Sequence, residues 1–305
     1  MSNILVTGGC GFIGSNLVDQ LIKLSNEVYV IDNLSTGLKS NKNVKARYYL
    51  KDIQDYIEFN ASLKNLIRKH SIKIVYHLAA LSDVREGIKD PKMTFIINQL
   101  SLVAISKICA DNDVEKFVYT STSAVYGEPK YLPVDELHIT IPISPYGLSK
   151  LGGEQFLHYL NKNCDMEIIV LRLPNVYGPR QRSDLEGGVV SIFNNKIKKG
   201  EKVIFYGDGN QTRDWVHVYD IVDGLIKIIE VSNFDYIVIS LGSGIENSLW
   251  NLFNILKKYY NYKLNPILEG ERKGDIKRMI MSGIKAKNLL DWEAKINLEE
   301  GVKLM

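Results

Sequence analysis

A tyrosine and a lysine four residues apart, Tyr146 and Lys150, are the pair in this chain best suited to acid–base chemistry. On a helix, this spacing puts both side chains on one face, about one turn apart. A free phenol has a pKa near 10, so a tyrosine that acts as a general base near neutral pH needs this pKa lowered by roughly three units, about 4 kcal/mol. A neighbouring ammonium group stabilises the phenolate and shifts the pKa in that direction.

The same spacing occurs three times, so the surroundings must decide which pair can act. The pairs are Tyr126/Lys130, Tyr146/Lys150 and Tyr259/Lys263. Pro129 lies inside the first pair and argues against a helix there. The last pair lies in a polar segment near the C-terminal end. Ser144 and Pro145 are a typical N-cap and first-turn residue, so the middle pair is predicted at the start of a helix.

Three hydroxyl side chains, Ser121, Thr122 and Ser123, follow an apolar run at 117–119 that predicts a strand. In open α/β sheets the ligand crevice lies at the C-terminal ends of the strands. These hydroxyls can therefore bridge Tyr146 to a substrate oxygen. The alternative is that they only cap the end of the strand.

Near the N-terminus, Gly8, Gly11 and Gly14 lie between an apolar strand pattern at 4–6 and helix-spaced apolar residues at 12–24. Glycines allow a tight turn and let pyrophosphate oxygens approach backbone N–H groups at a helix N-terminus. The order strand, glycine triplet, helix is typical of dinucleotide binding. It predicts a cofactor whose nicotinamide ring adds positive charge beside Tyr146.

The next predicted strand, residues 28–31, ends in Asp32, which is followed by Asn33, Leu34 and Ser35. A carboxylate at this point accepts hydrogen bonds from the adenosine ribose and repels a 2′-phosphate. The sequence therefore favours NAD over NADP. Asp52 is a second candidate, for the adenine edge.

Short apolar runs alternate with helical patterns over the first half of the chain. Strands are predicted at 4–6, 28–31, 74–76, 117–119 and 168–171, with helices at 12–24, 60–69, 93–110 and 145–161. Apolar strands separated by helices indicate a parallel sheet covered on both faces, that is, a doubly wound α/β (Rossmann) domain.

After Leu173 the pattern changes, because residues 174–188 are rich in Gly, Pro and charge. Residues 203–217 predict two short strands around a Gly-Asp-Gly turn, 218–245 a helix then a strand, and 246–305 small helices and loops. We expect an NAD-binding domain of 1–173 plus 216–245, and a smaller, discontinuous substrate lobe of 174–215 plus 246–305.

Composition excludes several classes of protein. The 305 residues are 45% hydrophobic and 24% charged, and the net charge is only +3, which argues against a nucleic-acid binder. Cys10, Cys109 and Cys164 lie far apart without CxxC spacing, so neither a disulfide framework nor a metal site is expected. No uninterrupted apolar stretch approaches the roughly 18 residues of a membrane span, and no secretory signal is visible. A cytoplasmic location is expected.

Several motifs in order resemble the extended short-chain dehydrogenase/reductase family, and within it the nucleotide-sugar epimerases, with UDP-glucose 4-epimerases closest. The motifs are Thr-Gly-Gly-Cys-Gly-Phe-Ile-Gly at 7–14, Asp-Asn-Leu at 32–34, His-Leu-Ala-Ala at 77–80, Ser-Thr-Ser-Ala-Val-Tyr-Gly at 121–127, Ser-Pro-Tyr-Gly-Leu-Ser-Lys at 144–150, Arg-Leu-Pro-Asn-Val-Tyr-Gly-Pro at 172–179, Gly-Asp-Gly-Asn-Gln-Thr-Arg-Asp at 207–214 and Arg-Lys-Gly-Asp at 272–275. The resemblance covers nearly the whole chain.

The resemblance implies a role for each matching residue. It implies that Thr122, Tyr146 and Lys150 are the catalytic residues. It implies NAD contacts from Gly8, Gly11, Phe12, Ile13, Gly14, Asp32, Asn33, Asp52, Ile53, Leu78, Ala79, Ala80, Asn98, Tyr146, Lys150 and Pro174. It implies nucleotide-sugar contacts from Ser82, Thr122, Ser123, Tyr146, Asn175, Arg213, Arg272 and Asp275. Guanidinium groups suit a diphosphate, which agrees with the two arginines in this set.

The reaction implied is NAD-dependent 4-epimerisation of a UDP-hexose, UDP-glucose or UDP-galactose, through a transient 4-keto sugar. Related dehydratases carry a carboxylate directly after the catalytic Thr, whereas Ser123 and Ala124 follow Thr122 here. Met279 and Ser82 stand where relatives vary with the sugar. UDP-N-acetylhexosamines and UDP-uronic acids therefore stay open as substrates, as does another nucleotide-sugar oxidoreductase activity.

A different class of function is a non-catalytic NAD-binding or RNA-binding relative. Such proteins often lose the Tyr/Lys pair or acquire a basic face, and the sequence has neither change. No nucleic-acid, membrane or metal partner is expected. By family analogy, a homodimer should form through the helices at 93–110 and 145–161.

Overall fold

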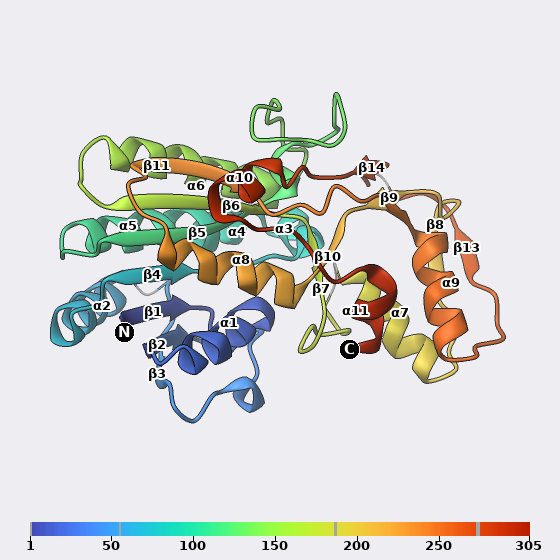
Figure 1. Cartoon of the computed structure of the whole chain (residues 1–305), viewed down its shortest axis with the longest axis horizontal. Coiled ribbons are helices and arrows are strands. Elements are labelled where there is room, and N and C mark those ends of the chain that lie inside the picture. Colours follow the sequence, from blue (N-terminus) through green and yellow to red (C-terminus); the bar gives the residue numbers. More distant parts are fainter. Residues whose placement is uncertain (1, 55, 186–187, 273–274) are drawn as a thin grey trace.

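Seven parallel strands form the central sheet of the protein (Figure 1), in the spatial order β11-β6-β5-β4-β1-β2-β3. The computed structural model describes residues 2–54, 56–185, 188–272 and 275–305. The strands are β1 (Asn3–Thr7), β2 (Glu27–Asp32), β3 (Arg47–Leu50), β4 (Ile74–His77), β5 (Lys116–Thr122), β6 (Glu167–Leu173) and β11 (Tyr236–Ser240). Parallel pairing puts all their C-terminal ends at one edge, where ligands bind in such folds.

Helices cover both faces of the sheet, so each strand alternates between two cores. One face carries α1 (Phe12–Lys23), α8 (Val218–Glu230) and α10 (Ile284–Leu290), and the other carries α2 (Tyr56–His70), α5 (Ser101–Ala110) and α6 (Pro145–Asn161). In β1, Ile4 and Val6 pack with the first group and Leu5 with the second. The doubly wound α/β fold expected from the sequence is confirmed.

A long helical run leads into α5. It comprises α3 (Val84–Lys89), α4 (Pro91–Phe95), a π-helical turn η2 (Ile96–Leu100) and then α5. By length and mean hydropathy (1.5) alone, Pro91–Ala110 could cross a membrane. The segment contains Lys92, Asn98 and Lys107, so it is not an uninterrupted apolar stretch of the kind considered in the sequence analysis, and that expectation is not contradicted. The run contacts α6 and α2, so it forms part of the helix layer on this face of the sheet.

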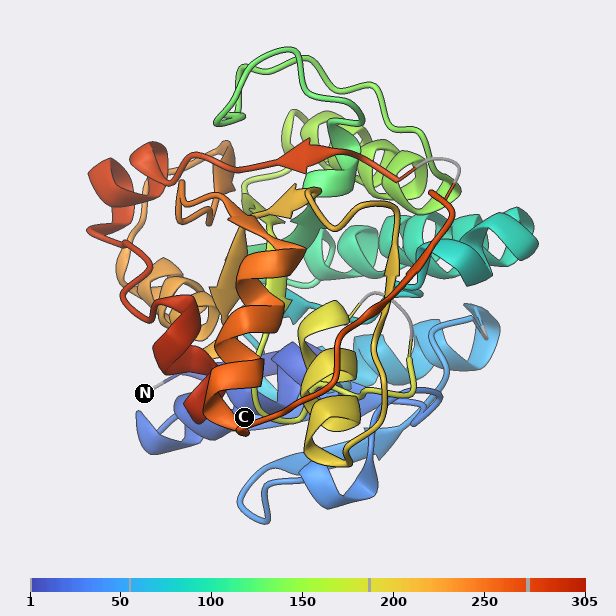
Figure 2. The ribbon, with the colours of Figure 1, turned by 90° about the vertical axis from the view of Figure 1, so that its right-hand side faces the viewer.

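The remaining elements build a smaller lobe beside the C-terminal edge of the sheet (Figure 2). Its core contains Phe193, Phe205 and Phe253. Its elements are β7 (Asn175–Tyr177), α7 (Val189–Lys198), β8 (Ile204–Tyr206), β9 (Thr212–Arg213), β10 (Trp215–His217), β12 (Asn247–Ser248), α9 (Leu249–Tyr259), β13 (Ile267–Glu269), β14 (Arg278–Met279) and α11 (Leu298–Lys303). The short helical turns η1 (Lys39–Asn41) and η3 (Ser123–Val125) complete the structure.

Part of the C-terminal segment packs differently from the expected division into two units. The α10 residues Ala286 and Leu290, together with Trp292, belong to the same core as α1 and α8. Trp292 Nε1 donates a hydrogen bond to the carbonyl of Asp220 at 2.8 Å. The segment 284–292 thus packs on the nucleotide domain, although it follows the lobe in sequence.

Candidate active site

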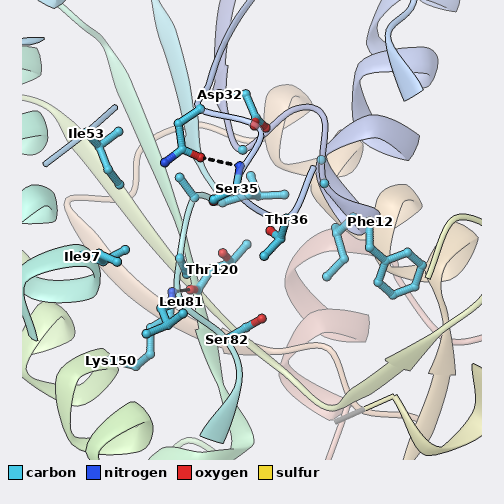
Figure 3. A pocket seen from close by; sticks show the side chains of 18 of the residues that line it. Phe12, Asp32, Ser35, Thr36, Ile53, Leu81, Ser82, Ile97, Thr120 and Lys150 are labelled. Carbon is cyan, nitrogen blue, oxygen red and sulfur yellow. Dashed lines mark hydrogen bonds between the residues drawn. The ribbon is translucent and has the colours of Figure 1, made fainter. Parts of the chain in front are cut away.

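A cleft of about 380 Å³ opens at the C-terminal edge of the sheet, where β1, β2, β4, β5 and β6 end (Figure 3). Most of the residues expected at the site line it together. They are Gly8, Gly11, Phe12, Ile13, Gly14, Asp32, Asn33, Asp52, Ile53, Leu78, Ala79, Ala80, Ser82, Thr122, Tyr146, Lys150 and Pro174. Residues separated by up to 166 positions in sequence therefore meet in one cavity.

The glycine-rich turn leaves no room for side chains. Gly8 has a φ of +74°, and its N–H donates to the carbonyl of Ile31 at 2.8 Å. A Cβ on Gly14 would lie 2.2 Å from the Gly8 carbonyl oxygen. Gly11 is the N-cap of α1 and has no side chain to cap the first turn, so the N-terminus of this helix is open to an anion.

Asp32, at the end of β2, is a buried carboxylate with a fixed orientation. It accepts hydrogen bonds from the backbone N–H groups of Cys10, at 2.8 Å, and Leu34, at 2.7 Å. Asn33 next to it donates through Nδ2 to Asp52 at 3.1 Å. The negative charge thus lies at the ribose position relative to the glycine turn and suits a 2′-hydroxyl rather than a 2′-phosphate.

Tyr146 and Lys150, the pair predicted to be catalytic, lie in the first turns of α6, where the sequence predicts a helix start. Ser144 is the N-cap and accepts a hydrogen bond from the N–H of Gly147 at 3.1 Å. The Thr122 hydroxyl lies within hydrogen-bonding reach of the Tyr146 phenol. Lys150 Nζ donates to the carbonyl of Thr120 at 2.8 Å and lies 4.7 Å from the centre of the Tyr119 ring. A phenol, a hydroxyl and an ammonium group therefore converge at the end of β5.

Burial sets the protonation of this pair in the protein itself. It raises the pKa of Tyr146 to about 12, an effect that the Thr122 hydrogen bond opposes. It lowers the pKa of Lys150 to about 7, while the Glu154 carboxylate acts in the opposite direction. The expected lowering of the Tyr146 pKa by Lys150 is therefore not a property of the protein alone. The phenol becomes a base only when further positive charge lies beside it.

The other two hydroxyls have different environments. Ser121 is buried and donates through Oγ to the Glu154 carboxylate. Ser123 begins η3 and is not among the residues that line the cleft. Of the three, Thr122 therefore has the geometry for contact with a substrate oxygen.

Asn98 lies behind the cleft wall. Its side chain accepts from the N–H of Leu81 at 2.8 Å and donates to the carbonyl of Leu81 and to Ser149 Oγ. It is fully buried in the π-helical turn, a distortion that is frequent at functional sites. Its contacts anchor the segment that carries Leu81 and Ser82 into the cleft (Figure 3).

Four of the eight residues expected to hold the nucleotide-sugar, Asn175, Arg213, Arg272 and Asp275, belong to the second lobe. Asn175 lines an adjoining cavity of about 280 Å³ together with Arg180 and Arg182. Arg213 is largely buried, and burial lowers its pKa while the charges of Asp275 and Glu128 raise it. The guanidinium of Arg272 stacks on the ring of Tyr206 at 3.2 Å. Lys273 and Gly274 of the same motif lie outside the described residues.

Met279 lies in β14, beside Arg213 of β9. It is buried among Val125, Tyr126, Val134 and Met281. Two of these neighbours, Val125 and Tyr126, follow directly on the segment 121–124, which contains Thr122. Met279 thus contacts the η3 segment that follows Thr122 and does not itself line the cleft.

Several cleft residues escaped the sequence analysis. Ser35, Thr36, Lys51, Gln54, Leu81, Ile97, Thr120, Leu173 and Val176 also line the cavity. Most are immediate neighbours of motif residues, so an extension of each motif by one or two positions would have included them. Ile97 carried no such signal, because it lies within an apolar helix pattern.

The cavity and its donors fit NAD. The glycine cradle and open helix N-terminus suit the pyrophosphate, Asp32 suits an unphosphorylated ribose, and the Tyr146/Lys150 pair marks the nicotinamide end. Position 8 of the turn requires glycine, since a Cβ there would lie 2.8 Å from the backbone of Ala79. Fold and site together define a dinucleotide-dependent enzyme of the short-chain dehydrogenase type.

Comparisons with known proteins define the family. The chain belongs to the NAD dependent epimerase/dehydratase family, whose model matches residues 4–242. It is 32% identical to the UDP-glucose 4-epimerase of Mycolicibacterium smegmatis, over 98% of this chain and 95% of that protein.

Two solved structures are similar over nearly the full length. One is a UDP-glucose 4-epimerase from Thermotoga maritima with UDP-glucose, which is 38% identical with a TM-score of 0.94 and covers 99% of this chain and 96% of that one. The other is a UDP-N-acetylglucosamine 4-epimerase from Methanobrevibacter ruminantium in complex with UDP-N-acetylmuramic acid, which is 31% identical with a TM-score of 0.91 and covers 99% and 97%. Membership of the NAD dependent epimerase/dehydratase family, together with the fit of the cleft, identifies NAD as the cofactor of this protein.

Proposed function

We propose that the protein is a UDP-sugar 4-epimerase whose substrates are UDP-glucose and UDP-galactose. The observation that carries the proposal is the convergence of Thr122, Tyr146 and Lys150 on the same cleft as the glycine turn and Asp32. The similarity to the Thermotoga maritima epimerase with UDP-glucose supports this choice of sugar.

The chain's own residues suit this reaction. When bound, NAD supplies the hydride acceptor and donor and a positive ring charge beside Tyr146. The Tyr146 phenolate removes the proton from O4, and the Thr122 hydroxyl holds that oxygen by a hydrogen bond. Lys150 adds positive charge that favours the phenolate. Arg213 and Arg272 supply the charge that would hold the UDP diphosphate while the sugar turns over.

Elimination of water is not supported by the site. Ser123 and Ala124, directly after Thr122, have no carboxyl group to act as acid or base. The same absence at these two positions argues for simple inversion at C4.

The test is product analysis with a panel of UDP-sugars and no added reductant. Purified protein should interconvert UDP-glucose and UDP-galactose, with inversion at C4 by NMR and unchanged mass. The panel includes UDP-N-acetylhexosamines and UDP-glucuronic acid, and faster turnover of either would reassign the sugar. Loss of water would indicate a dehydratase, and net consumption of NADH a reductase.

We propose further that the protein is a homodimer joined through its helices at 93–110 and 145–161. Large apolar side chains are exposed there, including Leu100, Leu148 and Tyr159, which is 66% exposed. α5 and α6 lie side by side on one face of the sheet. Light scattering should give twice the chain mass, and a monomer at micromolar concentration would contradict the proposal.

A further inference from the structure

A buried ion pair lies directly beneath the catalytic groups. Glu154, one helical turn beyond Lys150 on α6, and Arg172, on β6, are both less than 7% exposed. Arg172 donates to the Glu154 carboxylate from Nη2 at 2.7 Å and from Nε at 3.1 Å. The Ser121 hydroxyl also donates to Glu154 Oε1. The carboxylate thus joins the catalytic helix, the catalytic strand and β6.

The pair extends into a wider buried network. Arg172 Nη1 donates to the Tyr126 hydroxyl at 3.2 Å, and that hydroxyl lies 3.3 Å from Ser240 Oγ on β11. The Tyr236 hydroxyl donates to the backbone carbonyl of Glu154 at 3.1 Å. Every polar atom of the Arg172 and Glu154 head groups therefore meets a partner from a different element. A buried pair of this kind is costly unless so fully bonded.

Sequence adjacency connects the network to the reacting groups. Ser121 immediately precedes Thr122, whose hydroxyl lies within hydrogen-bonding reach of the Tyr146 phenol. Glu154 lies four residues after Lys150, so the two side chains project from the same face of α6. A shift of either charged partner would move Thr122 relative to Tyr146 and change the field at Lys150.

We propose that Glu154 and Arg172 are positioning residues of the epimerase site, which fix Thr122 against Tyr146 through Ser121 and set the balance of charge at Lys150. The proposal rests on the epimerase function proposed above. Neither residue lines the cleft, so both act through other groups.

The groups that face Lys150 determine the direction of the effect. From β5 comes the Tyr119 ring, from β4 His77, and from α6 Tyr146 and Glu154. His77 is fully buried, and burial lowers its pKa to about 3, so it stays neutral. Tyr119 is neutral as well, because burial raises its pKa far above the usual range. Glu154 supplies the negative charge that favours the ammonium form of Lys150.

Removal of the two partners should therefore have opposite effects on the pH profile. Glu154→Gln removes the negative charge and leaves Arg172 unpaired. Lys150 then loses its proton at lower pH, so the alkaline limb of the kcat–pH profile shifts to lower pH. Arg172→Met leaves the Glu154 carboxylate unpaired, which favours the ammonium form of Lys150 and shifts the alkaline limb to higher pH. Each shift should be about one pH unit, with kcat reduced about tenfold or more and KM for the UDP-sugar changed much less.

The experiment measures kcat and KM from pH 6 to 10 for the full-length protein and these two variants. Arg172→Lys, which keeps the charge, should restore the wild-type limb, and a thermal melt checks the fold of each variant. The matched control is Lys116→Met, which breaks the largely buried Lys116–Glu167 pair at the other end of β5. This control should lower stability without moving the pH profile.

Opposite shifts in the two variants support the inference. Shifts in the same direction, or profiles that coincide with wild type in variants that fold, overturn it. If either variant fails to fold, the double variant Glu154→Gln/Arg172→Met decides by the same profile, which should then lie between those expected for the single variants. Absence of turnover of any UDP-sugar by the wild-type protein would instead refute the proposed function.

Discussion

Lys150 Nζ donates a hydrogen bond to the carbonyl oxygen of Thr120 at 2.8 Å, which ties the catalytic helix α6 to the end of β5. Lys150 is buried, with only 2% of its surface exposed, and its ammonium group faces the Tyr119 ring. Burial lowers its pKa to about 7. A side chain that the proposed reaction needs as a cation is thus placed where the cation is disfavoured, as is common at catalytic sites.

Replacement of Lys150 by Met should stabilise the fold at acidic pH while abolishing turnover. The folded-state pKa of Lys150, about 7, lies below the ordinary lysine value of 10.5, so the unfolded chain binds this proton more tightly between these values. The destabilisation that comes from burying the Lys150 ammonium group is complete below pH 7 and disappears as the pH rises towards 10.5. We expect the variant to gain about 1–3 kcal/mol at pH 6 and little at pH 10, measured by urea unfolding. A loss of stability at pH 6 would contradict this.

Replacement of Tyr146 by Phe should remove the proton-transfer group and leave the cleft intact. We expect kcat to fall by about 10²–10⁴-fold, while NAD and UDP still bind in calorimetric titrations. The control is Tyr259→Phe, since Tyr259 and Lys263 have the same spacing outside the site and Tyr259 is 47% exposed. Comparable turnover by Tyr146→Phe and wild type would rule out the assigned base.

Asp32→Asn tests how the cofactor is selected. The amide keeps one acceptor for the N–H groups of Cys10 and Leu34 but loses the charge. NAD affinity should fall about tenfold, and discrimination against NADP should shrink, because the repulsion of a 2′-phosphate is gone. NADH fluorescence titration measures both. Asp52→Asn, in the same cleft, should have a smaller effect on both affinities. An equal effect would mean that the assignment of the ribose contact to Asp32 is wrong.

The sequence was most informative where chemistry depends on contiguous residues. The glycine turn, Asp32 and the start of α6 depend on local spacing and capping, so each could be placed before the fold was seen. The Thr122–Tyr146 contact needed the family resemblance, because 24 positions separate the two residues and only the sheet brings them together.

Features set by long-range packing could not be predicted. β3 has only four residues and lies at the sheet edge with Arg47 and Leu50 exposed, so it lacks the apolar run of a buried strand. In the sequence, Arg172 is a single charge next to an apolar strand pattern, and only the fold shows that it pairs with Glu154. The direction of the Tyr146 pKa shift depends on how deeply the phenol is enclosed, which spacing on a helix does not reveal.

Gly14→Ala should impair both the cofactor site and the fold, whereas Gly270→Ala should be harmless. A Cβ on Gly14 would meet the Gly8 carbonyl oxygen at 2.2 Å, so α1 must move away from the turn that holds the pyrophosphate. A Cβ on Gly270 meets nothing within 4 Å. We expect Gly14→Ala to lower the free energy of unfolding by about 1–3 kcal/mol and to weaken NAD binding more than tenfold, measured by urea unfolding and calorimetry. NAD binding by Gly14→Ala equal to that of Gly270→Ala would mean that the pyrophosphate does not lie over this turn, and the cofactor orientation derived from it would have to be abandoned.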